Sequence, residues 1–363
     1  MINLVLRERK KPEMKITFCL PSILKVPSGG FKIVFEYANR LSDRGHEVSI
    51  VCLTDTHYTN YTKSDFVKNI LGKFRIKGYP NWFKLRSSIK VYATPYHDGR
   101  HFPDADVVVA TSARTSFIIN DLPVSKGKKF YLIQDFETWG MSENKLIESY
   151  QLGLTNIVVS KWLSEIVLTK ANVESKLLSN PIDTEKFFVV KPIEERSSFE
   201  IAMLYHTGKH KGIPIAFEAL ERVKKEIPNL HVNLFGVFDS PELPPWITYT
   251  QKANDIQLLE IYNKSSIFIC ASNAEGFGLT GAESMACGCA LASTAYQGVF
   301  EYAQNNINAL LSDVGDSEML AENIIKLVKN SEFRLQLAKR GSEDLKKFSW
   351  ENAVDTLEII LNS

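Results

Sequence analysis

Two glutamates, Glu275 and Glu283, lie on either side of a glycine-containing turn, with seven residues between them. An apolar run over 266–271 precedes them and predicts a strand buried on both faces. Apolar positions at helical spacing, from Leu279 until Gly288, predict a helix after the turn. The N–H groups that begin such a helix bind phosphate, whereas carboxylates accept hydrogen bonds from hydroxyl groups. The stretch therefore predicts a ligand with both phosphate and sugar, such as a nucleotide sugar.

Two other interpretations of this stretch are open. Gly276, Gly278 and Gly281 fit the pattern G-x-G-x-x-G of dinucleotide-binding folds, which would make the chain an NAD oxidoreductase. Against this, Glu275 would face the pyrophosphate, and the next expected strand, 289–293, ends without the acidic residue that binds a ribose. The stretch could also be an ordinary strand–turn–helix with solvated glutamates.

A loop rich in cations follows the strand expected over 200–205. It contains His206, Lys209 and Lys211 and leads into a helix with one apolar face. Ligands of parallel α/β sheets bind at the carboxyl ends of strands, so cations here suit a diphosphate. We expect Lys211 to neutralise charge on a leaving group, and the alternative is a solvated loop lysine.

Acidic side chains follow another expected strand, over 130–133. Gln134, Asp135 and Glu137 come directly after it and would face the same edge of the sheet. They could orient an acceptor hydroxyl or take its proton. A helix cap or a surface charge explains Glu137 equally well.

Gly29 and Gly30 close the loop after the strand expected over 15–20. A helix and a further strand over 48–53 follow, and this alternation predicts a parallel sheet. The glycines would either let the backbone approach a ligand or form the turn into the helix.

Asp104 and Asp106 match the D-x-D pattern that holds Mg²⁺ or Mn²⁺ in one class of sugar-transfer enzymes. They precede the strand expected over 107–110, so they would lie at the edge opposite the ligand. We therefore expect these aspartates to be structural.

Length and composition limit the class of protein. A chain of 363 residues with 44% hydrophobic residues suits two α/β domains. The net charge of +1 argues against nucleic-acid binding. Five cysteines without a CxxC pair suit reduced thiols in a cytoplasmic protein. No apolar run approaches the roughly 18 residues of a membrane span.

Residues 63–90 interleave basic and aromatic side chains. This mixture suits contact with an anionic membrane surface or with a lipid-phosphate acceptor. The alternative is a solvated loop whose aromatic side chains pack back on the sheet.

Composition and turn residues also predict the domain organisation. We expect an N-terminal extension, a first α/β domain, a linker that is polar and interrupted by proline, a second α/β domain and a terminal helix. The expected ranges are, in this order, 1–14, 15–183, 184–198, 199–347 and 348–363.

Several motifs together resemble glycosyltransferase family 4, the retaining nucleotide-sugar transferases of the GT-B fold. The resemblance spans nearly the whole chain from Lys15, and the stretch with two glutamates is its most specific part. The motifs that carry it are Gly29-Gly30, Arg44-Gly45-His46-Glu47-Val48, Asn180-Pro181-Ile182-Asp183, Lys211-Gly212, 275–283, 283–288 and Phe348-Ser349-Trp350.

The resemblance implies two Rossmann-like, doubly wound parallel-sheet domains that face a central cleft, with the terminal helix crossing back to the first domain. The N-terminal domain would bind the acceptor and the C-terminal domain would bind the nucleotide sugar. Glu283 would bind the ribose and Glu275 the transferred sugar, while Lys211 would sit on the diphosphate. Gly29 and Gly30 would approach the diphosphate from the other domain. Gly276, Phe277, Gly278, Leu279 and Thr280 would hold phosphate and sugar.

This chain departs from the family's pattern at two places. Where the family often has Gly-Arg before the Lys-Gly, the chain has Tyr205-His206, so His206 or Lys209 would supply the second cation, or it would be absent. The family's frequent histidine near the sugar is replaced around Gln134 and Asp135.

These observations predict transfer of a hexosyl or deoxyhexosyl unit from a nucleotide diphosphate sugar to a glycan or lipid-linked glycan, for a cell-surface polysaccharide or glycoconjugate. The resemblance implies a mechanism that retains the anomeric configuration, without a cofactor and without a metal ion in the site. The expected location is the cytoplasm, with peripheral contact at the inner face of a membrane. The alternative is a non-catalytic GT-B subunit that binds a glycan or glycoprotein for an active partner.

Overall fold

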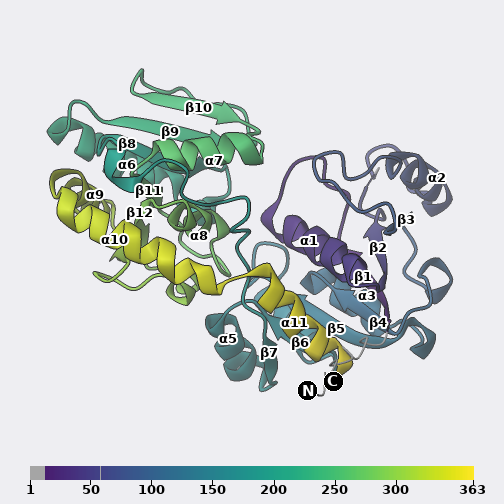
Figure 1. Ribbon diagram of the computed structural model, residues 1–363. Coiled ribbons are helices and arrows are strands. Elements are labelled where there is room, and N and C mark those ends of the chain that lie inside the picture. The colour runs from purple at the N-terminus through teal and green to yellow at the C-terminus, as the bar shows by residue number, and fades with distance from the viewer. Residues whose placement is uncertain (1–12, 58) are drawn as a thin grey trace, which may run out of the picture. The chain divides into compact units, whose positions relative to one another are not determined.

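The computed structural model describes residues 13–57 and 59–363. Two parallel β-sheets, with helices between most successive strands, confirm the two Rossmann-like α/β domains (Figure 1). The extension expected over 1–14 lies outside the described residues, apart from its last two positions.

The first sheet has the strand order β3-β2-β1-β4-β5-β6-β7. Its strands are β1 (Lys15–Leu20), β2 (Glu47–Leu53), β3 (Lys90–Thr94), β4 (Val107–Ala110), β5 (Lys128–Ile133), β6 (Thr155–Val158) and β7 (Ser175–Leu177). Its helices are α1 (Gly29–Asp43), α2 (Asp65–Arg75), α3 (Ala113–Asn120), α4 (Glu143–Tyr150) and α5 (Lys161–Ala171).

The second sheet has the strand order β10-β9-β8-β11-β12-β13. Its strands are β8 (Glu200–Tyr205), β9 (His231–Gly236), β10 (Ile247–Gln251), β11 (Ile267–Cys270), β12 (Ala290–Thr294) and β13 (Ala309–Ser312). The helices that follow in the chain are α6 (Ile213–Glu226), α7 (Asp255–Lys264), α8 (Leu279–Ala286), α9 (Ser317–Lys329), α10 (Ser331–Asp344) and α11 (Trp350–Asn362).

In both sheets the strand order reverses beside the first strand in sequence, between β1 and β4 and between β8 and β11. Successive connections leave the sheet in opposite directions at such a switch point, and the loops at the carboxyl ends of the two strands open a crevice. The loops that follow β8 and β11 are therefore the positions where the second sheet can bind a ligand.

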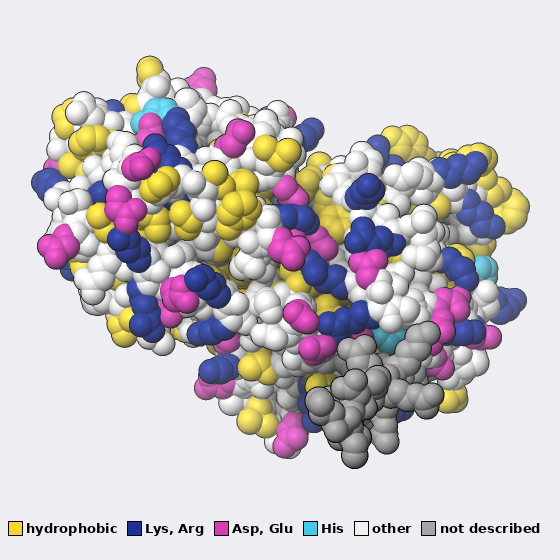
Figure 2. All heavy atoms as spheres, in the orientation of Figure 1, with side chains coloured by type: hydrophobic (Ala, Val, Ile, Leu, Met, Phe, Trp, Pro, Cys, Tyr) yellow, Lys and Arg dark blue, Asp and Glu magenta, His cyan; other side chains and the backbone are white. Residues whose placement is uncertain are grey.

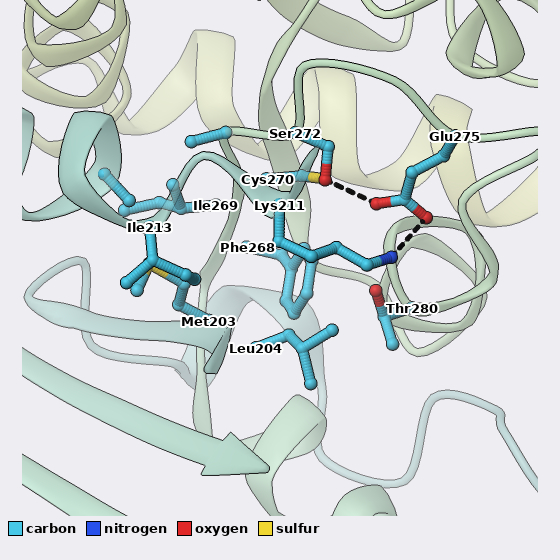
Figure 3. A pocket seen from close by; sticks show the side chains of 12 residues that line it. Met203, Leu204, Lys211, Ile213, Phe268, Ile269, Cys270, Ser272, Glu275 and Thr280 are labelled. Atoms are coloured by element: carbon cyan, nitrogen blue, oxygen red, sulfur yellow. Dashed lines mark hydrogen bonds and ion pairs between the residues drawn. The ribbon is translucent and has the colours of Figure 1, made fainter. Parts of the chain in front are cut away.

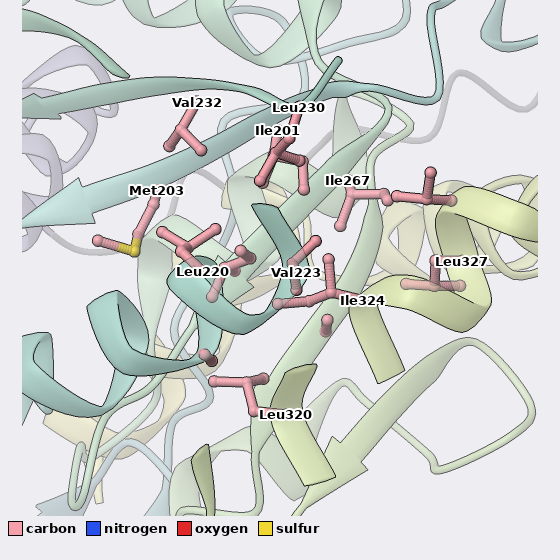
Figure 4. Packing of buried hydrophobic residues seen from close by; sticks show 14 of the residues in the cluster. Ile201, Met203, Leu220, Val223, Leu230, Val232, Ile267, Leu320, Ile324 and Leu327 are labelled. Atoms are coloured by element: carbon pink, nitrogen blue, oxygen red, sulfur yellow. The ribbon is translucent and has the colours of Figure 1, made fainter. Parts of the chain in front are cut away.

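The alternation of side chains along β11 explains how the second sheet is covered on both faces. Ile267 and Ile269 point into a cluster formed with α6 and α9, to which Leu220 and Ile324 belong (Figure 4). Phe268 points to the other face, where its ring meets Tyr262 of α7 with centroids 5.8 Å apart. A strand buried on both faces is the result that the apolar run predicted.

Four elements of the first half were not predicted from the sequence: β3, α2, α4 and α5. The first three residues of β3 are exposed or half-buried, so the strand lacks a continuous apolar run. The inner face of α2 carries Lys68 and Gly72 in place of apolar residues. Periodicity is therefore a weak signal in β3, whereas α2 has apolar residues at helical spacing that lie on its exposed face.

By compactness the chain divides into two units. The first contains the described residues up to Lys25, 30–131 and 152–155, and the second contains 26–29, 132–151 and 156–363. The domain boundaries expected from the sequence stay a prediction.

Candidate functional site

The loops after β8 and β11 bring Lys211 and Glu275 together. The Lys211 Nζ lies 3.0 Å from the Glu275 Oε2, and both side chains are largely buried (Figure 3). The Ser272 hydroxyl donates a short hydrogen bond to the other carboxylate oxygen of Glu275. Thr280, in the first turn of α8, lines the same small pocket. The pair thus lies at the switch point of the second sheet.

A glycine after Lys211 makes this placement possible. Gly212 has φ +59°, and a Cβ at this position would overlap with the carbonyl oxygen of Ala271. The two loops are also joined by the Asn273 N–H, which donates to the His210 carbonyl at 2.7 Å. The Lys-Gly pair therefore lets the first loop pass close to the second and directs the lysine toward Glu275.

The charge on Lys211 is stabilised by carboxylates. Burial alone would lower the pKa of Lys211, but the ion pair with Glu275 and the nearby charge of Asp135 raise it above its usual value. The ammonium is therefore charged at neutral pH and can bind an anionic ligand.

Asp135 joins this pair from the loop after β5. Burial and the charge of Glu275 raise the pKa of Asp135 to about 6, while a hydrogen bond from the Phe136 N–H and the charge of Lys211 oppose the shift. The Phe136 N–H lies 2.8 Å from the Asp135 Oδ1. Two carboxylates thus share the field of one ammonium, and Asp135 changes protonation close to neutral pH. All these residues belong to the second compact unit.

The glycines of the turn before α8 have a structural reason that the sequence did not reveal. A Cβ at Gly276 would overlap with the Gln134 carbonyl, and one at Gly278, where φ is +92°, would overlap with the Tyr296 hydroxyl. The Tyr302 hydroxyl donates to the Gly278 carbonyl at 3.0 Å. Close protein neighbours therefore require these glycines, whether or not a ligand also approaches them. Phe277 is buried between them, and its ring lies against that of Tyr302.

Glu283 is buried in α8, near the hydroxyl of Tyr262. The Tyr262 hydroxyl donates to the Glu283 Oε2 at 3.5 Å. Burial, together with the charge of Glu283, raises the pKa of Tyr262 well above its usual value, so the phenol stays a donor. The binding of a ribose by Glu283 remains a prediction.

His206 lies in the cation-rich loop but is not itself a cation at neutral pH. Burial and the nearby charge of Lys211 lower the pKa of His206 to about 4. Its Nδ1 accepts the Gly208 N–H at 2.8 Å, so the ring proton is on Nε2. His206 is therefore a neutral hydrogen-bond donor in this state. Lys209, the other expected substitute for the family's arginine, is exposed.

Gly29, Gly30 and Glu137 were also expected at the site. Gly29 begins α1, and a Cβ there would lie 3.4 Å from the Leu279 Cδ1. Gly30, the second residue of α1, belongs to the first unit. Glu137 is half-buried two residues after Asp135.

Three further residues of the site were not predicted: Ser272, Trp139 and His210. The indole of Trp139 stacks on the imidazole of His210, with ring centroids 5.6 Å apart and planes inclined by 16°. Burial and the charge of Lys211 lower the pKa of His210. The position of His210 directly before Lys211 was the one signal that could have identified it.

The D-x-D aspartates have structural partners, as expected. The Asp104 carboxylate pairs with Lys126 at 2.7 Å, and Asp106 accepts the Lys15 N–H at 2.7 Å. Among residues 13–57 and 59–363, no group of three or more His, Cys, Asp or Glu side chains could hold a metal ion.

Part of the chain is similar to a known protein family. Residues 184–344 match the family model described as glycosyl transferases group 1. The matched range contains β8, β11 and the complete Lys211–Glu275 pair. This part of the chain is thus similar to group 1 glycosyltransferases, and the match covers a little less than half of the chain.

Two curated relatives and one solved structure illustrate the similarity. N-acetyl-alpha-D-glucosaminyl L-malate synthase of Bacillus anthracis is 24% identical over 53% of this chain and 55% of its own length. The capsular polysaccharide biosynthesis glycosyltransferase CapM of Staphylococcus aureus is 23% identical over 67% of this chain and 68% of its own. The crystal structure of Anabaena HepE in complex with UDP and glucose is 15% identical, with a TM-score of 0.72, over 96% of this chain and 100% of HepE.

Some of these matches cover only part of the relative's length. The chain spans 28% of the length of a Methanocaldococcus jannaschii glycosyltransferase and 55% of the Bacillus anthracis enzyme. The similarity to HepE shows the fold, which is GT-B as expected. Within the described part of the chain, no helix is both long and apolar enough to cross a membrane.

Proposed function

We propose that the protein transfers a hexosyl or deoxyhexosyl unit from a nucleotide diphosphate sugar to a glycan acceptor, with retention of the anomeric configuration. The observation that carries this proposal is the buried Lys211–Glu275 pair at the switch point of the second sheet. The similarity to group 1 glycosyltransferases and the UDP complex of HepE support a nucleotide-sugar donor.

When the donor binds, Lys211 and Glu275 would each exchange the other for a group of the donor. A diphosphate has more charge than one carboxylate, so it would compete with Glu275 for the Lys211 ammonium. The Glu275 carboxylate would then accept hydrogen bonds from hydroxyls of the sugar. The N–H groups at Leu279 and Thr280 would bind phosphate oxygens, and Glu283 would bind the ribose.

Transfer would follow from stabilising the leaving group. As the bond between the anomeric carbon and the diphosphate oxygen breaks, Lys211 would balance the growing charge. The acceptor oxygen would attack from the same face of the sugar, and its proton would pass to the departing diphosphate. Asp135, ionised above about pH 6, would accept a hydrogen bond from the acceptor hydroxyl. No metal ion is part of this proposal, so chelators should leave the rate unchanged.

The acceptor and the location are further parts of the proposal. CapM acts in capsular polysaccharide biosynthesis by its name, and this supports a surface glycan or lipid-linked glycan as acceptor. A cytoplasmic enzyme with such an acceptor would work at the inner face of a membrane, with residues 63–90 toward anionic lipid.

Thermal unfolding with UDP-, GDP- and dTDP-sugars tests the proposal. A donor at about 100 times its Kd adds about 2.7 kcal/mol to the free energy of unfolding. Lys211→Met should abolish this gain, whereas Lys225→Met, which removes an exposed lysine of α6, should preserve it. If no donor stabilises the parent more than Lys211→Met, the proposal is wrong. Binding without donor hydrolysis or transfer would instead identify the non-catalytic subunit.

A further inference from the structure

The outward face of α2 is apolar, which is unusual for a surface helix. Phe66, Ile70 and Phe74 lie four residues apart on it, and each Phe side chain is 67% exposed. Val67, beside them, is also exposed. A surface helix normally turns such a stripe toward the core. In α2 the stripe is instead exposed, most of all at its two phenylalanines.

The inward face of α2 explains why the helix keeps this orientation. Lys68 is buried there, and its Nζ donates to the Asp55 carbonyl at 2.8 Å and to the Asp65 carboxylate at 3.1 Å. A Cβ at Gly72 would lie 3.3 Å from the Cβ of Ala93 in β3. Rotation of the helix about its axis would remove the hydrogen bonds of Lys68 and lose this close packing. The apolar stripe is therefore held outward by the fold.

Cations surround the stripe. Residues 63–77 contain five basic and one acidic side chain, a net charge of +4, whereas the whole chain has +1. Lys63, Lys73 and Lys77 are exposed, and the Lys77 ammonium lies 5.2 Å from the centroid of the Phe74 ring. Figure 2 shows dark blue and yellow side chains next to one another over α2, at the upper right.

We propose that this face of α2, formed by Phe66, Ile70 and Phe74 with Lys63, Lys73 and Lys77, binds the surface of an anionic phospholipid membrane. The phenyl rings would enter the boundary between headgroups and acyl chains, and the lysines would reach lipid phosphates. A second copy of the chain fits less well, because two faces of net positive charge repel each other. This inference deepens the proposed function by naming the surface that would hold the enzyme near a lipid-linked acceptor.

Co-sedimentation of the full chain with vesicles tests the proposal without any donor or acceptor. The protein should bind vesicles with about 30% phosphatidylglycerol in phosphatidylcholine at least about tenfold more tightly than phosphatidylcholine alone. Added salt should weaken the binding, because exposed charges are screened. Vesicle binding with no nucleotide-sugar binding would contradict only the proposed function, and the reverse would contradict only this inference.

Variants on and off the face provide the controls. Phe66→Ser with Phe74→Ser should weaken binding to the anionic vesicles by about tenfold or more. The matched pair Ile256→Ser with Ile359→Ser, both 69% exposed on α7 and α11, should bind as the parent does. Circular dichroism and the melting temperature would show that each variant folds.

Charge variants form the second test. Lys63→Gln, Lys73→Gln and Lys77→Gln together should weaken binding by about tenfold or more. The exposed control lysines, Lys176, Lys225 and Lys347, should have no such effect when replaced together. Equal binding by all variants would overturn the proposal. So would a dimer that the phenylalanine variant abolishes, or binding to polyglutamate but not to vesicles.

Discussion

The two sheets have the same order of strands around their switch points, but the ion pairs at their carboxyl edges differ in charge balance. In the first sheet, Asp55 follows β2 and pairs with Arg114 of α3, and His97 lies 3.2 Å from the same carboxylate oxygen. Although burial would raise the pKa of Asp55, hydrogen bonds from His97 and Arg114 hold it well below its usual range. This carboxylate is strongly stabilised by its partners.

At the second sheet the carboxylates outnumber the cation beside them. Glu275 and Asp135 both lie near Lys211, and the pKa of Asp135 is raised to about 6 rather than lowered. A pKa shifted in this way, by burial together with a specific charged neighbour, is frequent at functional sites. The comparison indicates that the first cluster stabilises the fold, whereas the second is prepared for a ligand. Four predictions test this difference, from the largest expected effect to the smallest.

Replacement of Glu275 should have the largest effect. Glu275→Gln keeps the size of the side chain but removes the charge that holds Lys211 and would accept sugar hydroxyls. We expect the transfer rate to fall by about 10²–10³-fold, the loss that follows removal of one well-placed polar contact in a transition state. Steady-state kinetics with the donor identified by thermal unfolding would measure it. A rate within threefold or so of the parent would contradict the site assignment.

Replacement of Asp55 should lower the stability of the fold and leave donor hydrolysis unchanged. Asp55→Asn leaves Arg114 and His97 without their charged partner, and we expect a loss of about 2 kcal/mol in the free energy of unfolding, after allowance for solvent screening. Urea unfolding would measure this loss. Donor hydrolysis, measured where the variant is folded, should stay as in the parent. If hydrolysis falls as far as in Glu275→Gln, the two clusters do not differ as argued.

Replacement of Glu283 should weaken nucleotide binding more than it slows transfer. Glu283→Ala removes the acceptor expected for the ribose hydroxyls, and the Kd of the nucleotide diphosphate should rise about tenfold, or about 1.4 kcal/mol. Isothermal calorimetry with the nucleotide would measure it. Glu283→Gln, which keeps an acceptor oxygen near Tyr262, should lose less. Unchanged Kd values in both variants would exclude Glu283 from the donor site.

Replacement of Asp135 should change how stability depends on pH. Because folding raises the pKa of Asp135 from 3.8 to about 6, the fold favours the neutral carboxyl. The stability it contributes is complete below the unfolded pKa and is lost as pH rises through the folded pKa. Asp135→Asn, neutral at every pH, should therefore gain about 1–2 kcal/mol relative to the parent between about pH 4 and about pH 7.

Urea unfolding of parent and variant across this range would check the prediction. Asp313→Asn, at an exposed position after β13, is the control and should show no such gain. A gain for Asp135→Asn that does not vary with pH would show that the carboxyl is not raised by its surroundings.

Much of the fold could be predicted because its strands are short, continuous apolar runs. Residues 267–270 and 231–236 are strands in the structure, and both were recognised from the sequence. β3 was missed because it buries little apolar surface. In α2 the helical spacing of Phe66, Ile70 and Phe74 is present in the sequence, but the spacing does not show that this face points outward.

The parts of the site differ in the same way. Glu275 and Lys211 could be proposed from residue type and their position after strands. Ser272 and Trp139 could not, because a serine or an exposed tryptophan in a loop has no spacing that identifies a partner. The ion pair of Lys211 with Glu275 could not be predicted either, since it joins residues 64 positions apart.

The sequence by itself determined most of the segments that become strands and which loops carry cations and carboxylates, because burial and turn formation depend on nearby residues. Only the tertiary structure decided that Lys211, Glu275 and Asp135 share one electric field, and that Gly212 and Gly276 are required by neighbouring carbonyl groups. The physical reason is that pKa values and close packing depend on distances in space. Those distances are set by the order of the strands, which local sequence does not contain.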